Sequence, residues 1–573
     1  MNQKRENLLN LALETESNPV WEVIVKYHGD LEEAVLDLGE ETVVIERLIA
    51  GYAILQIPRF LMDAVTALPQ IEYMEIPKRF FYQEDLQNLN PGCRVRSGEN
   101  TDGLSGKDVL ILIADSGIDF RRNDFRNTDG TTRIRALWDQ TLIPEGEQRP
   151  PEGFQSGVEF HSDEINRALM ADREEGFLLV PSIDVSGHGT AVAGIASGRN
   201  DSTGYRGIAY GAELLVVKLG RAMEAGFPRT TQIMRAVTWG LRKAEELGRP
   251  LVVNLSFGNA YGSHDGSSLL ERFLDNAAEI GRTVICVGTG NEASSGGHII
   301  GRTAGERIQV ELSVGSFERN LPVQFWQNYS DLYRIFLQSP SNAVAELTVP
   351  VEGGKFTVTL GTTTILAYQG EPAPYAVAKE LYLELLPDSS EYVESGIWRM
   401  IIEPVKIVTG RFYLYLSDSA VRSPDTFFYA SVPDVTLTIP STAAKVISVG
   451  AYDSVYDAYA DFSGRGYAGA VRTIGVVPAG LVKPDLVAPG VNIPAPDLYG
   501  GYSSFTGTSF ATPQVAGTAA LLMEWGIVKG IDPFLYGEKV KAYLRRGARP
   551  LRGEQGYPNE RVGWGALCIR QSF

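Results

Sequence analysis

Three short motifs place an aspartate, a histidine and a serine in settings suited to nucleophilic catalysis. Asp115 opens D-S-G-I-D at the end of the apolar run VLILIAD, and His188 lies in S-G-H-G-T-A-V-A-G-I-A, where a helix is expected to begin. Ser509 lies in G-T-S-F-A-T-P-Q-V-A-G, in which a glycine turn leads into a helix of small residues. A hydroxyl there is close to a helix N-terminus, whose free N–H groups and dipole favour developing negative charge.

Together these residues form a coherent catalytic set. We expect Ser509 to be the nucleophile, His188 to take its proton, and Asp115 to orient the imidazole and stabilise the imidazolium. Taken singly, each has a simpler interpretation, as a turn carboxylate, a capping or core histidine and a helix N-cap, respectively. The remaining histidines have no comparable setting and are expected at the surface: His28, His161, His264 and His298.

A fourth candidate is Asn291, which follows the apolar run TVICVG in V-G-T-G-N-E. Taken alone it would be a turn residue. Beside the other three, its amide is placed to donate to the oxyanion of a tetrahedral intermediate, and loss of such a donor typically costs about 2.7–4 kcal/mol.

The surrounding elements divide the chain into four parts. Residues 20–80 give the order βαββαβ, and the polar stretch after them is typical of a linker. From about residue 108, strands alternate with helices, which predicts a doubly wound parallel α/β sheet with its site at the carboxyl ends of the strands. Short strand-like runs between about 303 and 434 predict an inserted all-β sandwich of jelly-roll type. The predicted parts are 1–82, 83–302, 303–434 and 435–573.

Composition narrows the class of protein. The 573 residues carry a net charge of −18, which argues against nucleic acid as a partner. The N-terminus lacks a continuous apolar run, and no stretch approaches 18 apolar residues, so we expect neither a secretion signal nor a membrane span. Three widely spaced cysteines, Cys93, Cys286 and Cys568, fit a reducing compartment better than a disulfide framework. We therefore expect a soluble, intracellular protein of several domains.

The motifs resemble those of the subtilases, the subtilisin-like serine proteases, over roughly residues 105–300 and 436–570. The order Asp, His, Ser is the subtilisin order. The resemblance also covers V-N-L-S-F-G and K-P-D-L-V-A-P-G. It implies that Ser256, Phe257 and Gly258 form an edge strand that pairs with the substrate backbone and lines the S1 pocket. The alternative for that segment is an ordinary strand end.

The resemblance extends to the layout of the chain. The N-terminal ferredoxin-like α+β unit resembles a subtilase prodomain, an intramolecular chaperone whose last residues fill the cleft, and processing is expected near Tyr82–Gln83. A retained prodomain and a jelly-roll insertion resemble the Csp germination proteases of spore-forming Clostridia. That likeness implies activation of a cortex-lytic zymogen by limited proteolysis, with the prodomain as a non-covalent partner, and a cytoplasmic or spore-associated location.

A calcium site is a further implication of the resemblance. R-N-D-S-T-G-Y resembles a subtilase calcium loop, with Asp201 as one ligand and Asp124 as its partner carboxylate. Carboxylates and loop carbonyls suit Ca²⁺, although a polar turn is the simpler interpretation. No other cofactor is expected.

Two other functions stay open at this stage. The chain could be a general intracellular subtilisin for protein turnover. It could also be a non-catalytic germination sensor or binding pseudoprotease, in which the insertion recognises a ligand.

Overall fold

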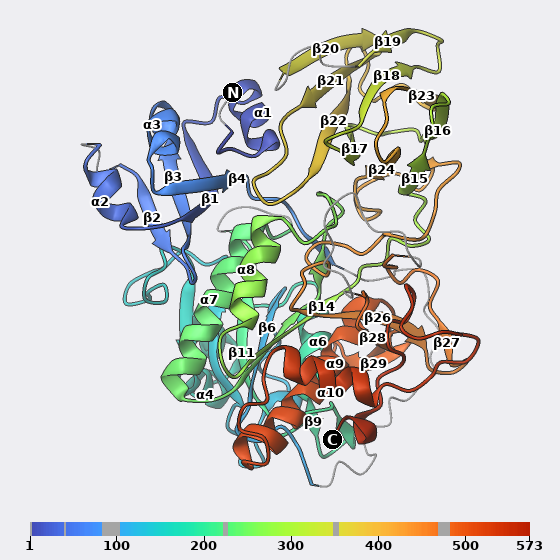
Figure 1. Cartoon of the computed structure of the whole chain (residues 1–573). Coiled ribbons are helices and arrows are strands. Elements are labelled where there is room, and N and C mark those ends of the chain that lie inside the picture. The colour runs from blue at the N-terminus through green and yellow to red at the C-terminus, as the bar shows by residue number, and fades with distance from the viewer. Residues whose placement is uncertain (1–2, 39–41, 83–102, 222–226, 348–353, 468–481) are drawn as a thin grey trace.

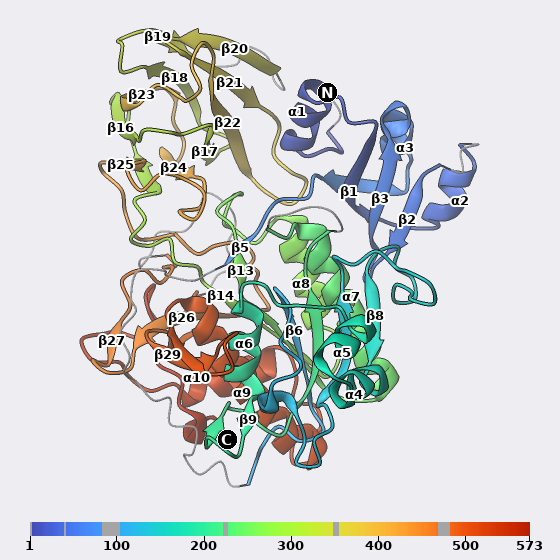
Figure 2. The same cartoon turned by 180° about the vertical axis from the view of Figure 1, so that it is seen from behind.

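The computed structural model describes residues 3–38, 42–82, 103–221, 227–347, 354–467 and 482–573. Three bodies are visible in Figure 1: an N-terminal unit in blue, a β-rich unit in yellow, and a larger α/β unit beneath both. The N-terminal and β-rich units lie next to each other above the α/β unit in both views (Figures 1 and 2).

A nine-stranded sheet forms the centre of the α/β unit. Its order is β27-β26-β14-β12-β6-β11-β7-β8, with β28 paired to β26. The pairs are parallel except at β7–β8 and β26–β27. The strands are β6 (Leu110–Asp115), β7 (Ile134–Asp139), β8 (Val158–His161), β11 (Glu213–Lys218), β12 (Leu251–Leu255), β14 (Thr283–Gly288), β26 (Ile447–Asp453), β27 (Ala458–Tyr459) and β28 (Leu486–Pro489).

Helices cover both faces of this sheet, as predicted. Ile111 and Ile113 of β6 pack with α6 and α9 on one face, and Leu110 and Leu112 pack with α7 and α8 on the other. The sequence of β6 is apolar without interruption because both faces of the strand are buried. The helices are α4 (Ser162–Met170), α5 (Arg173–Leu179), α6 (His188–Ser197), α7 (Thr230–Leu247), α8 (Leu269–Ala278), α9 (Thr508–Met523) and α10 (Glu538–Gly547).

The N-terminal unit has the predicted βαββαβ order, preceded by an additional helix that the sequence did not suggest. Its four strands form an antiparallel sheet in the order β2-β3-β1-β4. The elements are α1 (Asn7–Thr15), β1 (Val20–Tyr27), α2 (Leu31–Leu36), β2 (Val44–Arg47), β3 (Tyr52–Pro58), α3 (Met62–Ala67), β4 (Ile71–Glu75) and the short β5 (Phe81–Tyr82).

Buried charges join this unit to the α/β unit. Arg235 of α7 donates to Glu46 at 2.5 Å and to Glu22 at 3.2 Å, and all three side chains are largely buried. Tyr52 meets Phe273 of α8 edge-on, with the ring centroids 5.6 Å apart. The sheet of the N-terminal unit therefore rests on α7 and α8.

The β-rich unit consists of two antiparallel sheets packed around one core. The sheet orders are β15-β24-β17-β22-β21-β20 and β19-β18-β23-β16-β25. The unit begins at His298 rather than at 303, because β15 pairs with β24. The strands are β15 (His298–Arg302), β16 (Ile308–Val314), β17 (Leu321–Asn328), β18 (Leu332–Gln338), β19 (Val344–Glu346), β20 (Gly354–Leu360), β21 (Thr363–Gln369), β22 (Ala378–Pro387), β23 (Gly396–Lys406), β24 (Arg411–Leu416) and β25 (Phe427–Phe428).

Helix α1 lies between the N-terminal unit and the β-rich unit. Its Leu11 packs with Leu366, Tyr368 and Tyr382 of strands β21 and β22. Glu14 pairs with Lys355 of β20 at 2.9 Å. These contacts explain why the amphipathic segment is helical: its apolar side has a partner only in the folded chain.

The expectation of surface positions is wrong for His264 and His298. Both are buried, and both stack on Tyr415, with ring centroids 4.0 Å and 4.1 Å apart, respectively. This stack joins the insertion to the α/β unit, and burial lowers the pKa of His298 to about 3.

Two of the three cysteines are described. Cys286 is buried in β14 and Cys568 is partly exposed, and both are free thiols; Cys93 lies outside the described residues. Within the described ranges, no helix has the length and apolar character needed to cross a bilayer.

Candidate active site

Asp115 and His188 are brought into direct contact. Asp115 is the last residue of β6 and His188 the first of α6, and Oδ1 of the aspartate lies 2.7 Å from Nδ1 of the imidazole. Both side chains are almost completely buried. The same Oδ1 accepts the backbone N–H of Ser116 at 2.7 Å, which fixes the carboxylate. This contact sets the ring orientation that a general base requires.

Asp184 holds the loop that carries the histidine, and sequence reasoning missed it. Its carboxylate accepts from the hydroxyl of Ser116 at 2.8 Å, from the N–H of Gly187 at 2.9 Å, and from both N–H and Oγ1 of Thr190 at 2.9 Å and 2.7 Å. The loops that carry Asp115 and His188 are therefore joined through one buried acid. Its position four residues before His188, ahead of a helix start, was the available signal.

Ser509 lies at the N-terminus of α9, which packs against α6. Its hydroxyl donates to the carbonyl of Ser256 at 3.0 Å, and the Ser256 hydroxyl donates back to the carbonyl of Ser509 at 3.0 Å. Phe510 places its ring 5.4 Å from that of His188. The start of α9, which carries Ser509, therefore lies beside the imidazole that Asp115 holds.

Asn291, the oxyanion candidate, is held by the residue that precedes Ser509. Its Oδ1 accepts from the N–H of Thr508 at 3.1 Å and from its hydroxyl at 3.2 Å. This fixes the amide, so that the buried Nδ2 is turned away and has no hydrogen-bond partner among the described residues. Thr508 is thus a positioning residue that sequence reasoning did not single out.

An extended segment of the chain itself occupies the cleft beside these residues. Strand β5 pairs antiparallel with β13 (Phe257–Gly258), with Tyr82 opposite Phe257 and Phe81 opposite Gly258. The Tyr82 ring lies 4.5 Å from that of His188. Burial, followed by the charge of Asp115, raises the pKa of Tyr82 to about 12, so its hydroxyl stays protonated. Gln83, the other predicted processing residue, lies outside the described residues.

The β-rich insertion reaches the same region. Glu292, the residue after Asn291, accepts the hydroxyl of Ser419 at 2.6 Å. Burial, followed by the Glu292 carboxylate, holds the pKa of Asp418 well above its usual range. The loop after β24 therefore supports the segment that carries the oxyanion candidate.

Asp124 and Asp201 do not fit a calcium site as they are arranged. Arg122 donates to Asp124 at 3.0 Å, and Tyr502 donates to the other carboxylate oxygen at 2.6 Å. Asp201 is paired with Arg199 at 2.7 Å and with a second arginine, Arg206, at 3.0 Å. Among the described residues, no group of three or more His, Cys, Asp or Glu side chains could hold a metal. The calcium site stays a prediction that this donor set does not favour.

Buried guanidinium groups tie the nearby loops together. Arg122 donates to the carbonyls of Asp497 and Gly501 at 2.6 Å and 2.9 Å. Arg133 donates to the carbonyl of Ser197 at 2.5 Å and to that of Asp124 at 2.7 Å. Carbonyl oxygens of this kind are common ligands of cations, and here arginine supplies the positive charge.

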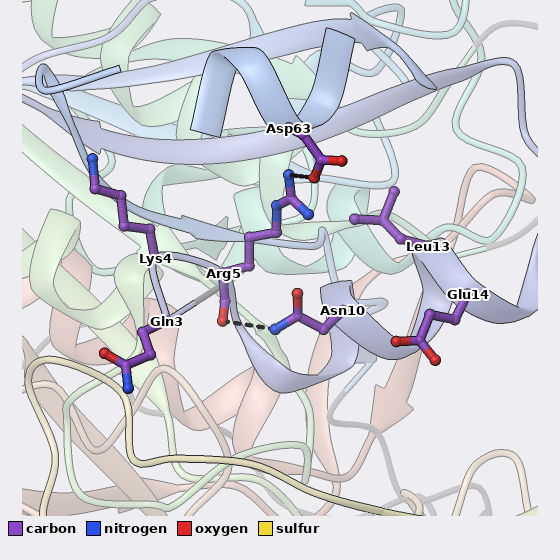
Figure 3. A pocket seen from close by; sticks show the side chains of 7 residues that line it. All are labelled: Gln3, Lys4, Arg5, Asn10, Leu13, Glu14 and Asp63. Carbon is purple, nitrogen blue, oxygen red and sulfur yellow. Dashed lines mark hydrogen bonds and ion pairs between the residues drawn. The ribbon is translucent and has the colours of Figure 1, made fainter. Parts of the chain in front are cut away.

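A hollow of about 640 Å³ in the N-terminal unit lies apart from the triad (Figure 3). Its buried cation is Arg5, which already donates to Asp63 at 2.7 Å, to Thr66 at 2.8 Å and to the carbonyl of Met62 at 2.8 Å. This guanidinium braces α3, and we assign no binding role to the hollow.

Family models give the decisive comparison. The model of the subtilase family matches residues 106–373 and 429–565, which together are more than half of the chain. The chain belongs to the subtilase family. A second model, that of the Csp protease B prodomain, matches residues 1–78 of this subtilase. The gap in the first match lies within the insertion.

Known structures and sequences agree with this assignment. The structure of the Clostridium perfringens CspB protease superposes with a TM-score of 0.74 and 33% identity, covering 82% of this subtilase and 94% of that chain. The minor extracellular protease Vpr of Bacillus subtilis is 23% identical over 82% of this chain and 52% of its own length. Serine protease AprX of the same strain is 34% identical over 24% of this chain and 31% of its own length. This subtilase therefore spans about half or less of these two curated relatives.

Proposed function

We propose that the chain is a serine endopeptidase that cuts its own prodomain and then acts on a protein substrate by limited proteolysis. One observation carries this proposal: the chain's own segment lies as a strand on β13, with Tyr82 against the ring of His188. Extended pairing with an edge strand is how a peptide is presented for cleavage.

In the proposed reaction, the hydroxyl of Ser509 attacks the carbonyl carbon of the scissile peptide while Nε2 of His188 takes its proton. Asp115 keeps the imidazole oriented and stabilises the imidazolium. The oxyanion forms within reach of Nδ2 of Asn291 and of the N–H groups at the start of α9. The proton then passes to the leaving amine, and water hydrolyses the acyl-enzyme by the same steps.

The register of the strand suggests which bond is cut. Tyr82 is opposite Phe257, and the residue before Phe257 is Ser256, whose carbonyl accepts the hydroxyl of Ser509. The residue that follows Tyr82 in the sequence is Gln83. We therefore place the scissile bond after Gln83.

Intact-mass measurement of the purified chain beside Ser509→Ala tests this proposal. We expect the wild type to give two fragments that separate after Gln83, and the variant to stay whole. A wild type that is also whole, or a cut outside residues 80–100, would contradict the proposal. Labelling of the processed wild type by a fluorophosphonate would show that the serine is competent, whereas persistent failure to label would favour a non-catalytic sensor.

We further propose that the substrate is a zymogen of the cortex-lytic class, activated during spore germination, and that the protein is cytoplasmic or spore-associated. The match to the Csp protease B prodomain and the likeness to the CspB protease support this. In this proposal the prodomain, ferredoxin-like in its strand order, stays bound after the cut, because Arg235 and its two acidic partners are buried between the units. The insertion, which we classify as a jelly roll, clamps it through α1.

Digestion of a panel of unfolded proteins separates this proposal from general protein turnover. We expect near-inactivity, because a retained prodomain and a dedicated substrate both restrict cleavage. Broad cleavage of the panel would favour the housekeeping function.

A further inference from the structure

A hollow of about 440 Å³ lies beside the catalytic histidine, outside the strand site described above. Its apolar wall includes Phe177, Ile183 and Leu498, whose side chains are 44%, 48% and 37% exposed, respectively. The neighbouring Val185 is 80% exposed. Large apolar side chains gathered around one hollow mark an interaction surface more often than singly scattered ones do.

Helix α5, which supplies Phe177 to this wall and packs against α4, leaves its apolar residues exposed. Helix α5 runs through R-E-E-G-F-L-L, and of these residues only Gly176 is buried. Phe177, Leu178 and Leu179 are all exposed. The apolar residues of a surface helix normally face a core. Here they are exposed instead, and α5 lies on the same side of the molecule as α6 (Figure 2).

The hollow is continuous with the strand site. Asp184 lines it and also bonds Ser116 and Gly187 of the two catalytic loops. Leu498, another residue of the lining, lies against Gly187. A Cβ atom added to this glycine would come within 2.9 Å of Cγ of Leu498. The loop that carries Asp184 and Gly187 also reaches the strand site, because the hydroxyl of Tyr82 lies 3.5 Å from Oγ of Ser186. A chain that occupies the strand site therefore passes directly beside the hollow.

The charges around the hollow do not select for a charged partner. On the rim, Arg121 and Arg173 are balanced by Asp119 and Glu174. The third acid of the lining, Asp184, is buried and accepts hydrogen bonds from the loops behind it. The described part of the prodomain lies elsewhere, because its sheet rests on α7 and α8 and its strand β5 lies beside the histidine. We take the occupant to be a bound protein whose chain already lies in the cleft.

We propose that this hollow, formed by α5 and the loops around Ile183 and Leu498, is a second docking site for the protein substrate. It takes apolar side chains that lie outside the strand paired with β13. The inference rests on the proposed endopeptidase function and deepens it, since it names a determinant of substrate choice beyond the strand site. The proposed docking site also gives a role to the segment between Asp115 and His188, because α5 and Ile183, which line the hollow, belong to that segment.

Two peptides that share one cleavage sequence test the proposal. Both begin with R-F-F-Y-Q and continue through a flexible Gly/Ser spacer of about eight residues, which lets the tail reach any point near the cleft. One tail is F-L-I-F and the other is S-S-S-S. Both peptides are cut slowly, because the retained prodomain competes for the strand site, but this competition is the same for both. We expect the processed wild type to cut the apolar-tailed peptide with kcat/KM about fivefold higher, through a lower KM.

The double variant Phe177→Asp/Ile183→Asp should lose this preference and still cut the serine-tailed peptide at the wild-type rate. A matched control, Ile531→Asp/Phe534→Asp, changes two side chains that are 59% and 72% exposed and do not line the hollow. The control should keep the preference.

Equal cutting of both peptides by the wild type, or a preference that survives in the double variant, would overturn the docking site while leaving the endopeptidase intact. If the wild type cuts neither peptide, the proposed function fails and the docking site fails with it. A concentration-dependent dimer that the double variant dissolves would assign the surface to a second copy of the chain and so overturn the proposal.

Discussion

Asn291→Ala removes the buried side-chain donor that we propose for the oxyanion. Nδ2 of Asn291 has no partner among the described residues, while its Oδ1 is fixed by two hydrogen bonds from Thr508. The donor is therefore already oriented and costs no reorganisation during the reaction. Loss of such a donor typically raises the barrier by about 2.7–4 kcal/mol, which lowers the rate by about 10²–10³-fold.

Self-processing gives a clean assay for this change, because the cut is intramolecular and needs no second substrate. Chain unfolded in urea is diluted into buffer, and the loss of full-length protein is followed on gels. The rate should be independent of protein concentration. Thr508→Val should slow the cut less than Asn291→Ala, because the backbone N–H of residue 508 still holds the amide.

A control separates chemistry from folding. Ser509→Ala and Ser509→Ala/Asn291→Ala both stay uncut, so their melting temperatures can be compared directly, and we expect them to agree. If Asn291→Ala processes within about tenfold of the wild-type rate, Asn291 is not the main oxyanion donor and the assignment is refuted.

Three other predictions test the joints of the molecule. Arg235→Met leaves Glu46 buried without its cation, at a cost of about 3–5 kcal/mol, so the cut prodomain should separate from the catalytic unit on size exclusion; co-elution would contradict this. The folded protein keeps His298 neutral down to about pH 3, whereas the unfolded chain protonates near pH 6.5, so stability should fall as the pH drops through that window, by up to about 1.4 kcal/mol per unit. His298→Phe should flatten the dependence of the unfolding free energy on pH in this window, as measured by urea denaturation at a series of pH values. An unchanged pH dependence would show that His298 is not its cause. Excess chelator should leave the melting temperature unchanged, because arginines already pair with Asp124 and Asp201; a lower melting temperature would restore the calcium site.

Much of the fold could be predicted because its signals are local. VLILIAD is continuous and apolar because β6 is buried on both faces, and this pattern belongs to parallel sheets. Motif spacing likewise placed Asp115 beside His188, since residues that end parallel strands and begin the following helices meet at one edge of the sheet.

The remainder depended on contacts between distant segments. Helix α1 is stabilised by strands more than 350 residues away, which no local pattern could reveal. The buried position of His298 depends on Tyr415 in another strand. The sequence around Asp201 predicts a calcium ligand. Only the folded turn shows that Arg199 and Arg206 pair with this carboxylate and neutralise its charge.

The guanidinium groups of Arg122 and Arg133 have a consequence for the conditions that the protein tolerates. An exchangeable ion stabilises a fold by an amount that depends on its free concentration, and the effect vanishes when the ion is diluted or sequestered. A positive charge on a side chain has no such dependence, because it is covalently part of the molecule. The loops that carry Asp124 and Asp497 are therefore braced equally well in ion-rich and ion-poor surroundings, and the brace is inherited with the sequence instead of being acquired from the medium.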